Sequence, residues 1–436
     1  MNNILDAVQK FITEKQSSKK WIAGTDWVQY AGPYFDDKEY IAGIKSLLNG
    51  WLVLGQDALM FESLFPKLVT KEFGVLTNSG SSSNLIMLSA LTSKRLYNLK
   101  RGTKVITPIA GFPTTINPIF QLGFEPLFVD IDLNTLNLNL DQVEEVAKQG
   151  ARIITFAHVL GNPPNMDRLM DIVKRYDLIF LEDCCDALGS TYKDKPLGSF
   201  GEFSSFSFYP AHHMTMGEGG FVVCNTKLQE VVARSFREWG RGCYCVGKKA
   251  NLLKNGTCGN RFSNWITELP DEIFDHKYVY DEIGYNLKPI ELQASIGLEQ
   301  IKKLPDIHNR RRENYKQLYN IFKQYEEFFV LPEATENSNP SWFAFPLTIK
   351  DNSIFKRSNI TTYLESNKIQ TRQYFAGNIM LQPGYSGLID KNDVITKYPV
   401  ARKITTDTFF IGTSPVITSE QINYVNDMIF NFFKTI

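Results

Sequence analysis

The sequence predicts an α/β protein, in which a large domain with a mostly parallel sheet precedes a smaller C-terminal α+β domain. Three observations support this prediction. Short apolar runs recur along the first part of the chain, and helical patterns lie between them. After Ile301 this alternation gives way to a long helical pattern. Strands that are apolar on both faces are typical of a parallel sheet covered by helices on each side. We place an N-terminal segment at residues 1–50, the large domain at 51–301 and the small domain at 302–436.

The first expected elements are helices. The stretch "FDDKEYIAGIKSLLNG" predicts a helix that Asp36 or Asp37 can cap and that Gly50 ends. Its apolar face is expected to consist of Ile41, Ile44, Leu47 and Leu48, which recur at helical spacing. The stretch "NSGSSSNLIMLSAL" is a small polar turn that opens into a second helix. Backbone N–H groups and hydroxyls at such a start suit a phosphate, although an ordinary capped helix is the better explanation of this pattern taken alone.

The large domain is expected to hold buried strands at "KVITP", "PLFVDI", "RIITFAH" and "LIFLED". The patterns "NLDQVEEVAKQ" and "MDRLMDIVKRY" predict helices between and around these strands. In the small domain, we expect a long helix over "LPDIHNRRRENYKQLYNIFKQY" and a strand at "SWFAFPLTI". Two further helices are expected at "ITTYLESN" and "TSEQINYVNDMIFNFF".

Composition narrows the functional class. Lys+Arg and Asp+Glu both number 47, so no net charge draws the chain to a nucleic acid polymer or an acidic membrane. The N-terminus "MNNILDAVQKFITEKQSSKK" has no apolar core of a signal peptide. No stretch approaches the ~18 apolar residues of a membrane span. We therefore expect a cytoplasmic protein.

The six cysteines are expected to be buried thiols or metal ligands, because structural disulfides are rare in the cytosol. Cys224 ends the apolar run "GFVVC" and is expected in the core. Cys184 is also expected to be buried, which leaves four cysteines to explain, namely Cys185, Cys243, Cys245 and Cys258.

Two segments suggest chemistry. "LIFLEDCCDALG" places Asp183 at the carboxyl end of a buried strand, where open α/β sheets bind ligands. A buried carboxylate there needs a cation or hydrogen-bond donors, and the ring nitrogen of a vitamin B6 cofactor is such a cation. A helix-capping aspartate is an equally good explanation of this segment. "SFYPAHHMTMGEGG" holds the adjacent His212 and His213, and no lysine occurs from Gly201 to Thr226.

The order of these motifs resembles the DegT/DnrJ-type sugar aminotransferases, which have the fold-type I aminotransferase architecture. The resemblance spans nearly the whole chain and includes "GFPTTINP", "DIDLNTLNL", "EDCCDALGS", "LGSFGEFSSFSFYP", "GEGG" and "GYNLKPIELQASIGLEQ". In that family, a lysine that binds pyridoxal phosphate (PLP) stands at the position of His212. The resemblance narrows to a subgroup with histidine there, the 3-dehydratases of nucleotide-linked 4-keto-6-deoxy sugars, which are lyases that use pyridoxamine phosphate (PMP). "FDHKYVYDEIGYNLK" is most similar to those that act on CDP-4-keto-6-deoxyglucose in 3,6-dideoxysugar pathways, which serve O-antigen and lipopolysaccharide biosynthesis.

The resemblance implies a role for each matching residue. Gly80, Ser81 and Ser207 would bind the cofactor phosphate, and Phe112 would stack on its ring. Asp183 would keep the ring nitrogen protonated, and His212 would remove a proton from the carbon that bears the amino group. Asp186 stands where the family has Gln or His and would lie near the ring oxygen, while Tyr209 would line the sugar pocket. Asn286 matches a residue lent to the neighbouring subunit, which implies a homodimer.

The resemblance also implies a 2Fe–2S cluster on Cys185, Cys243, Cys245 and Cys258. Electrons would then come from a separate flavin-containing, iron–sulfur NAD(P)H reductase. The gap from Cys245 to Cys258 is longer than in the family pattern, but a longer loop costs little closure entropy. Its basic stretch "VGKKANLLKNG" is a candidate docking site for the reductase.

Three alternatives remain at this point. A GDP-sugar dehydratase uses the same histidine without a cluster, and glutamate regenerates its cofactor. A plain sugar aminotransferase needs the lysine that position 212 lacks. An inactive relative with a binding role is disfavoured by the intact Asp183, Ser207 and Asn286 motifs. The sequence does not identify the nucleotide or the final sugar.

Overall fold

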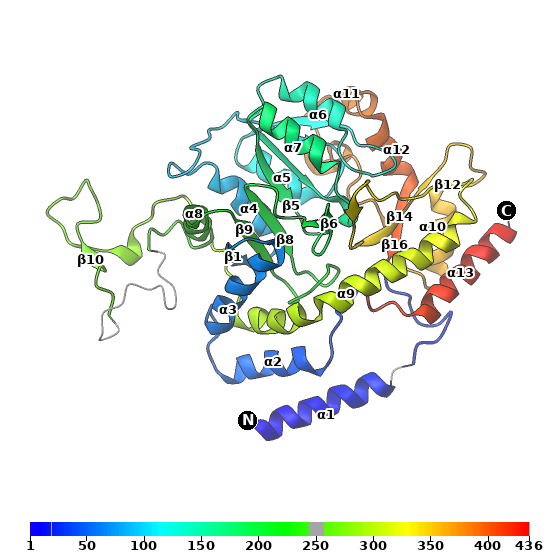
Figure 1. The fold of residues 1–436 in the computed structure, drawn as a ribbon, viewed down its shortest axis with the longest axis horizontal. Helices are drawn as coiled ribbons and strands as arrows, with labels where there is room; N and C mark the ends of the chain where they lie inside the picture. Colours follow the sequence, from blue (N-terminus) through cyan, green and yellow to red (C-terminus); the bar gives the residue numbers. More distant parts are fainter. Residues whose placement is uncertain (19, 244–256, 436) are drawn as a thin grey trace.

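A seven-stranded sheet forms the centre of the protein in a computed structural model that describes residues 1–18, 20–243 and 257–435 (Figure 1). The strand order is β1-β9-β8-β5-β4-β2-β3. The strands are β1 (Phe73–Thr77), β2 (Lys104–Pro108), β3 (Glu125–Val129), β4 (Ile153–Ala157), β5 (Ile179–Asp183), β8 (Phe203–Ser207) and β9 (Gly220–Cys224). All neighbours from β8 to β3 pair in parallel, whereas β9 runs antiparallel to both β8 and β1. The prediction of a mostly parallel sheet is therefore confirmed.

Helices cover both faces of this sheet, because alternate strand residues enter two different apolar clusters. Val105 packs with one cluster and Ile106 with the other. The first face is covered by α4 (Gly80–Ala90), α5 (Pro113–Gln121) and α8 (Lys227–Arg237). The second face is covered by α3 (Gln56–Leu64), α6 (Leu140–Ala147), α7 (Met166–Arg175) and the start of α9 (Glu291–Lys323). Burial on both faces explains the continuous apolar runs in the sequence.

The N-terminal segment consists of α1 (Asn2–Ser18) and α2 (Asp37–Leu48), and α2 packs along α9 (Figure 1). Asp36 caps α2 by accepting a hydrogen bond from the backbone N–H of Lys38, and Glu39 accepts one from the N–H of Asp36. The sequence predicted that Asp36 or Asp37 caps this helix, and the structure shows that the capping residue is Asp36.

A second, four-stranded antiparallel sheet lies in the C-terminal part, with the order β12-β14-β16-β15. Its strands are β12 (Phe329–Val330), β14 (Ala344–Ile349), β15 (Arg372–Gln373) and β16 (Thr408–Gly412). The accompanying helices are α10 (Arg357–Ser366), α11 (Lys391–Thr396), α12 (Pro399–Asp407) and α13 (Ser419–Lys434). Helix α9 is continuous across residues 301–302, where we expected the small domain to begin, and its second half packs in the core of this sheet.

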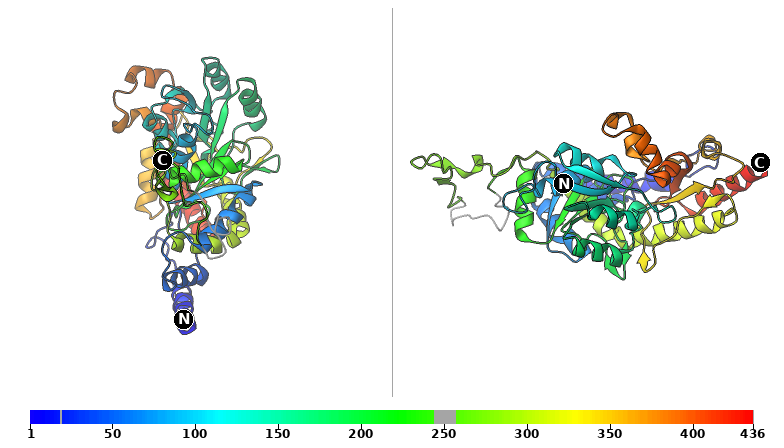
Figure 2. Two further views of the ribbon diagram at one scale, coloured as in Figure 1. Left: turned by 90° about the vertical axis from the view of Figure 1, so that its left-hand side faces the viewer. Right: turned by 90° about the horizontal axis from the view of Figure 1, so that it is seen from above.

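The remaining elements are short. A sheet of order β13-β6-β7 joins β6 (Thr191–Tyr192), β7 (Lys195–Pro196) and β13 (Ser338–Asn339). The pair β10 (Phe262–Ser263) and β11 (Phe274–Asp275) belongs to an arm that projects away from the rest of the molecule (Figures 1 and 2). Short 3-10 turns lie at Phe65–Val69, Val159–Gly161, His276–Tyr278, Ile379–Leu381 and Pro383–Tyr385. Within the described ranges, every helix is too short or too polar to cross a membrane.

Candidate active site

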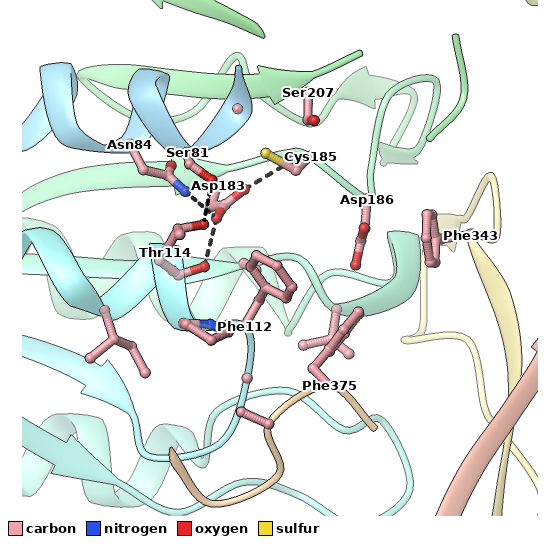
Figure 3. A pocket seen from close by; sticks show the side chains of 18 of the residues that line it. Ser81, Asn84, Phe112, Thr114, Asp183, Cys185, Asp186, Ser207, Phe343 and Phe375 are labelled. Atoms are coloured by element: carbon pink, nitrogen blue, oxygen red, sulfur yellow. Dashed lines mark hydrogen bonds between the residues drawn. The ribbon is translucent and has the colours of Figure 1, made fainter. Parts of the chain in front are cut away.

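A cavity of about 810 Å³ lies at the carboxyl ends of the parallel strands (Figure 3). One wall consists of residues at the start of α4, at the start of α5 and directly after β5 and β8. The far wall comes from residues of the second sheet and its loops, including Arg372, Phe375 and Phe410. The cavity therefore lies between the two sheets, which is a common place for a ligand in α/β proteins.

Asp183, the last residue of β5, is 3% exposed and accepts three hydrogen bonds at the base of this cavity. Its Oδ2 atom accepts from Asn84 Nδ2 at 2.8 Å and from Thr115 Oγ1 at 2.7 Å (Figure 3). Its Oδ1 atom accepts from the backbone N–H of Cys185 at 3.1 Å. A local capping role accounts for only the last of these bonds. Oδ1 keeps acceptor capacity, so the carboxylate can bind a further, cationic donor.

Asn84 and Thr115 are site residues that the sequence analysis missed. Asn84 lies within α4 and is itself fixed by Ser205 Oγ, which donates to Asn84 Oδ1 at 2.5 Å. The sequence gives only a weak signal, a polar residue that directly precedes the apolar run "LIML", and the structure shows that this residue is buried. Such a residue must find hydrogen-bond partners, and here Asp183 and Ser205 are those partners.

Gly80, Ser81 and Ser207 meet at the N-terminus of α4. A Cβ atom on Gly80 would lie 2.5 Å from the Cβ of Ser207 and 2.9 Å from the Sγ of Cys185, so the close approach of these segments requires glycine. Ser81 Oγ donates to Thr114 Oγ1 at 3.0 Å, and both side chains line the cavity. Hydroxyls gathered at a helix N-terminus form a suitable cradle for a phosphate.

His212 follows β8 and lines the same cavity, with 16% of its side chain exposed. Its Nδ1 atom lies 3.4 Å from Oδ1 of Asp186, and its ring centroid is 5.3 Å from that of Phe343. Tyr209 borders the ring at 6.4 Å. The arrangement places an imidazole beside a carboxylate, in a pocket where it can exchange a proton with a bound molecule.

His213 is structural, as the sequence suggested. Its Nε2 atom donates to the backbone carbonyl of Ser341 at 2.6 Å, and the side chain is buried. Burial and the nearby Arg311 hold the pKa of His213 well below its usual range, so the ring stays neutral. The two adjacent histidines therefore face different surroundings.

Aromatic side chains form the walls opposite Asp183. Phe112 is 48% exposed and meets Phe375 edge to face at 5.9 Å (Figure 3). Phe375 has a positive φ of 43°, a strained backbone conformation that is typical of functional walls and clamps. Arg372 lies over the ring of Tyr30 at 4.2 Å and also lines the cavity. The sequence analysis did not identify Phe343, Phe375 or Arg372, since no local pattern places them beside β5.

Of the four cysteines that were expected to share a cluster, the structure describes Cys185, Cys243 and Cys258. Cys185 lines the cavity, and burial together with Asp183 raises the pKa of its thiol well above the usual value. Cys243 follows α8 and Cys258 lies in the projecting arm, so neither lines the cavity. Cys245 and the basic stretch at 246–256 lie outside the described residues. Within the described part of the chain, the only group of three ligand-type side chains within 4.8 Å of one another is His158, Glu182 and Cys184.

Other predicted positions fall as follows. Cys184 and Cys224 are fully buried, as expected. Asn286 does not line the cavity of its own chain, and its Oδ1 atom accepts from Lys288 Nζ at 2.8 Å. The structure brings together nine of the predicted residues, namely Gly80, Ser81, Phe112, Asp183, Cys185, Asp186, Ser207, Tyr209 and His212.

Known proteins share both sequence and fold with this chain. The lipopolysaccharide biosynthesis protein RfbH of Salmonella typhimurium is 40% identical over 432 residues, which cover 99% of this chain and 97% of that protein. The dTDP-4-dehydro-2,6-dideoxy-D-glucose 3-dehydratase of Saccharopolyspora spinosa is 38% identical over 434 residues, or 99% of this chain and 92% of that protein.

Solved structures agree. The E. coli GDP-4-keto-6-deoxy-D-mannose 3-dehydratase with bound hydrated PLP matches with a TM-score of 0.78 and 28% identity, covering 92% of this chain and 99% of that one. The fold is therefore the fold-type I architecture that the motifs predicted. The model of the DegT/DnrJ/EryC1/StrS aminotransferase family matches residues 35–430, and the chain belongs to this family.

Proposed function

We propose that the protein is a PMP-dependent 3-dehydratase of a nucleotide-linked 4-keto-6-deoxyhexose. The observation that carries the proposal is His212, which lines the cavity at the position where the family resemblance places the cofactor-binding lysine. No lysine is among the described residues that line this cavity, so none of them can hold PLP as a Schiff base. Two of the relatives above are named 3-dehydratases, which supports the same reaction.

The residues present fit a vitamin B6 cofactor. Gly80 leaves room that a Cβ would fill, and the hydroxyls of Ser81 and Ser207 lie where a phosphate can be bound. The Oδ1 atom of Asp183 can accept the proton of a ring nitrogen, and Phe112 can cover the ring face. Bound PMP supplies an amino group that condenses with the 4-keto group and a ring that accepts electrons.

The remaining chemistry falls to the protein. With PMP bound, His212 would be the base for the proton on the cofactor carbon beside the amino group, and it would return this proton to the 3-hydroxyl that leaves as water. The Asp186 carboxylate lies 3.4 Å from Nδ1 of the imidazole and would favour its charged form after it takes up the proton. Asp183 keeps the ring nitrogen protonated, which favours electron withdrawal. Tyr209 borders the sugar, and Asn286 serves the cofactor phosphate of a second subunit in a homodimer.

The source of electrons is a second part of the proposal. A 2Fe–2S cluster on Cys185, Cys243, Cys245 and Cys258, reduced by a flavin-containing NAD(P)H reductase, rests on the cysteine pattern alone. Cluster ligands must be thiolates, and the described cysteines do not by themselves form a ligand set. The alternative is a cluster-free GDP-sugar dehydratase whose cofactor is regenerated by glutamate, and the similarity to the E. coli GDP-4-keto-6-deoxy-D-mannose 3-dehydratase supports it.

One experiment tests these proposals together. The protein is purified without oxygen, analysed for iron and sulfide, and incubated with PMP and the CDP-, GDP- or dTDP-linked 4-keto-6-deoxy sugar. Loss of the 3-hydroxyl, followed by mass spectrometry and absent in His212→Asn, supports the dehydratase; we expect CDP to be preferred. About two iron and two sulfide per chain support the reductase-coupled form. An iron-free protein that turns over with glutamate supports the alternative, and amino transfer without dehydration overturns both.

A further inference from the structure

Arg311 is a buried cation that joins three segments around the cavity. It lies on α9 and is 1% exposed. Its Nη2 atom donates to the backbone carbonyls of Ala211 and His212, at 3.1 and 3.0 Å. Its Nη1 atom donates to the carbonyls of Trp342 and Phe343, at 3.3 and 3.0 Å. One guanidinium therefore ties α9 to the loop after β8 and to the segment before β14.

The two tied segments carry side chains that meet in the cavity. His212 and Phe343 both line it, and their ring centroids are 5.3 Å apart. Arg311 does not line the cavity itself. The planar fork of an arginine can bind two peptides at once, which a lysine ammonium does less well. Arg311 can therefore act on the cavity only through the residues whose carbonyls it binds.

The charge of Arg311 is unusual for a buried arginine. Among the described residues, no carboxylate lies within 4.0 Å of its guanidinium, so four carbonyls take the place of an ion pair. Burial lowers the pKa of Arg311 to about 9, while the Asp186 carboxylate opposes this. The group is thus charged at neutral pH. A buried charge held only by backbone carbonyls is costly, so its retention points to a role in the arrangement it fixes.

We propose that Arg311 is a positioning residue that holds His212 against Phe343 in the wall of the cavity. The proposal rests on the proposed function in so far as His212 is the base. Removal of the guanidinium frees the carbonyls of His212 and Phe343 from their shared donor, so the two rings lose the spacing that they have in the cavity.

The test compares Arg311→Lys, Arg311→Gln and the matched control Arg312→Lys. Arg312 is the next residue of α9 and donates to the carbonyl of Gly189 at 2.8 Å, away from the His212 loop. The ring signals of the five histidines in the PMP-loaded protein are recorded by NMR at one fixed pH, and His212→Asn assigns that of His212. We expect Arg311→Gln and Arg311→Lys to displace the His212 signal, because the spacing of its ring from that of Phe343 changes, and Arg312→Lys to leave it in place.

Turnover provides the second readout. We expect Arg311→Lys to lower kcat by about 10- to 100-fold with little change in KM, because a small displacement of a catalytic group is enough for such a loss. Arg312→Lys should keep wild-type kcat. An unchanged His212 signal in Arg311→Gln, or wild-type kcat in Arg311→Lys, overturns the proposal. If Arg311→Gln does not fold, the kcat and the His212 signal of Arg311→Lys decide. If the wild-type protein performs no dehydration, the proposed function fails, and the His212 signal still decides whether Arg311 positions His212.

Discussion

Replacing Asp183 by asparagine removes one charge from the base of the cavity and changes little in shape. The carboxylate accepts from Asn84 and Thr115 on one oxygen and from the N–H of Cys185 on the other. An asparagine has one acceptor oxygen, so its amide nitrogen must face at least one of these donors. A buried donor without an acceptor costs about 1–3 kcal/mol of unfolding free energy. The larger effect concerns the cofactor, since a carboxylate raises the pKa of a neighbouring cation by about 1–3 units.

The ratio of protonated to neutral ring nitrogen should therefore fall by about 10- to 1000-fold in Asp183→Asn, and turnover should fall with the protonated fraction. The assay is single-turnover dehydration with PMP at saturation, together with urea unfolding of the cofactor-free protein. Thr115→Val is the control, because it removes one donor to Asp183 and keeps the charge. It should lose stability but keep most of the turnover. Wild-type turnover in Asp183→Asn with cofactor bound would refute the role of Asp183, and equal losses in both variants would mean that hydrogen bonding rather than charge matters.

Three further outcomes are expected. Gly80→Ala should weaken PMP binding, measured by fluorescence titration, because its Cβ would lie 2.5 Å from Ser207; Gly384→Ala, whose Cβ meets no atom within 4 Å, should not. His212→Lys should form a covalent link with added PLP that borohydride fixes, detected by intact mass, and an unmodified chain would contradict the assignment of position 212. Burial, together with the charges of Arg312 and Arg311, lowers the pKa of His308 to about 3. At mildly acidic pH the unfolded chain therefore binds a proton that the native chain does not. Stability should then be complete above about pH 6.5 and fall by about 1.4 kcal/mol per pH unit below it; urea unfolding at pH 7 and 5 should show a smaller loss in His308→Asn.

Local sequence signals identified much of the fold. The capped start of α2 and the four apolar runs at β2, β3, β4 and β5 were predictable because each is determined by a few consecutive residues. The antiparallel direction of β9 was not predictable, since "GFVVC" has the same composition as a parallel strand and its direction depends on its partners β1 and β8. Direction is a property of pairing over long separations rather than of the strand itself.

In the candidate site, too, local motifs reveal some residues, while only the fold brings in the others. Asp183 and His212 stand in motifs that can be recognised along the chain. Their neighbours come from distant positions: Asn84 is 99 residues from Asp183, and Phe343 reaches His212 from the segment before β14. The cysteine pattern stays a prediction: Cys185 lines the cavity, Cys243 and Cys258 do not, and Cys245 lies outside the described residues.

The far wall of the cavity has a consequence for biosynthesis of the protein. All seven strands of the large sheet have been synthesised once the chain reaches Cys224, and the phosphate cradle at α4 belongs to that part. Arg372, Phe375 and Phe410 are added only near the end of translation. A nascent chain on the ribosome would thus offer an open half-site to the cofactor for much of its synthesis. The far wall of the site is completed only as the last strand, β16, leaves the exit tunnel.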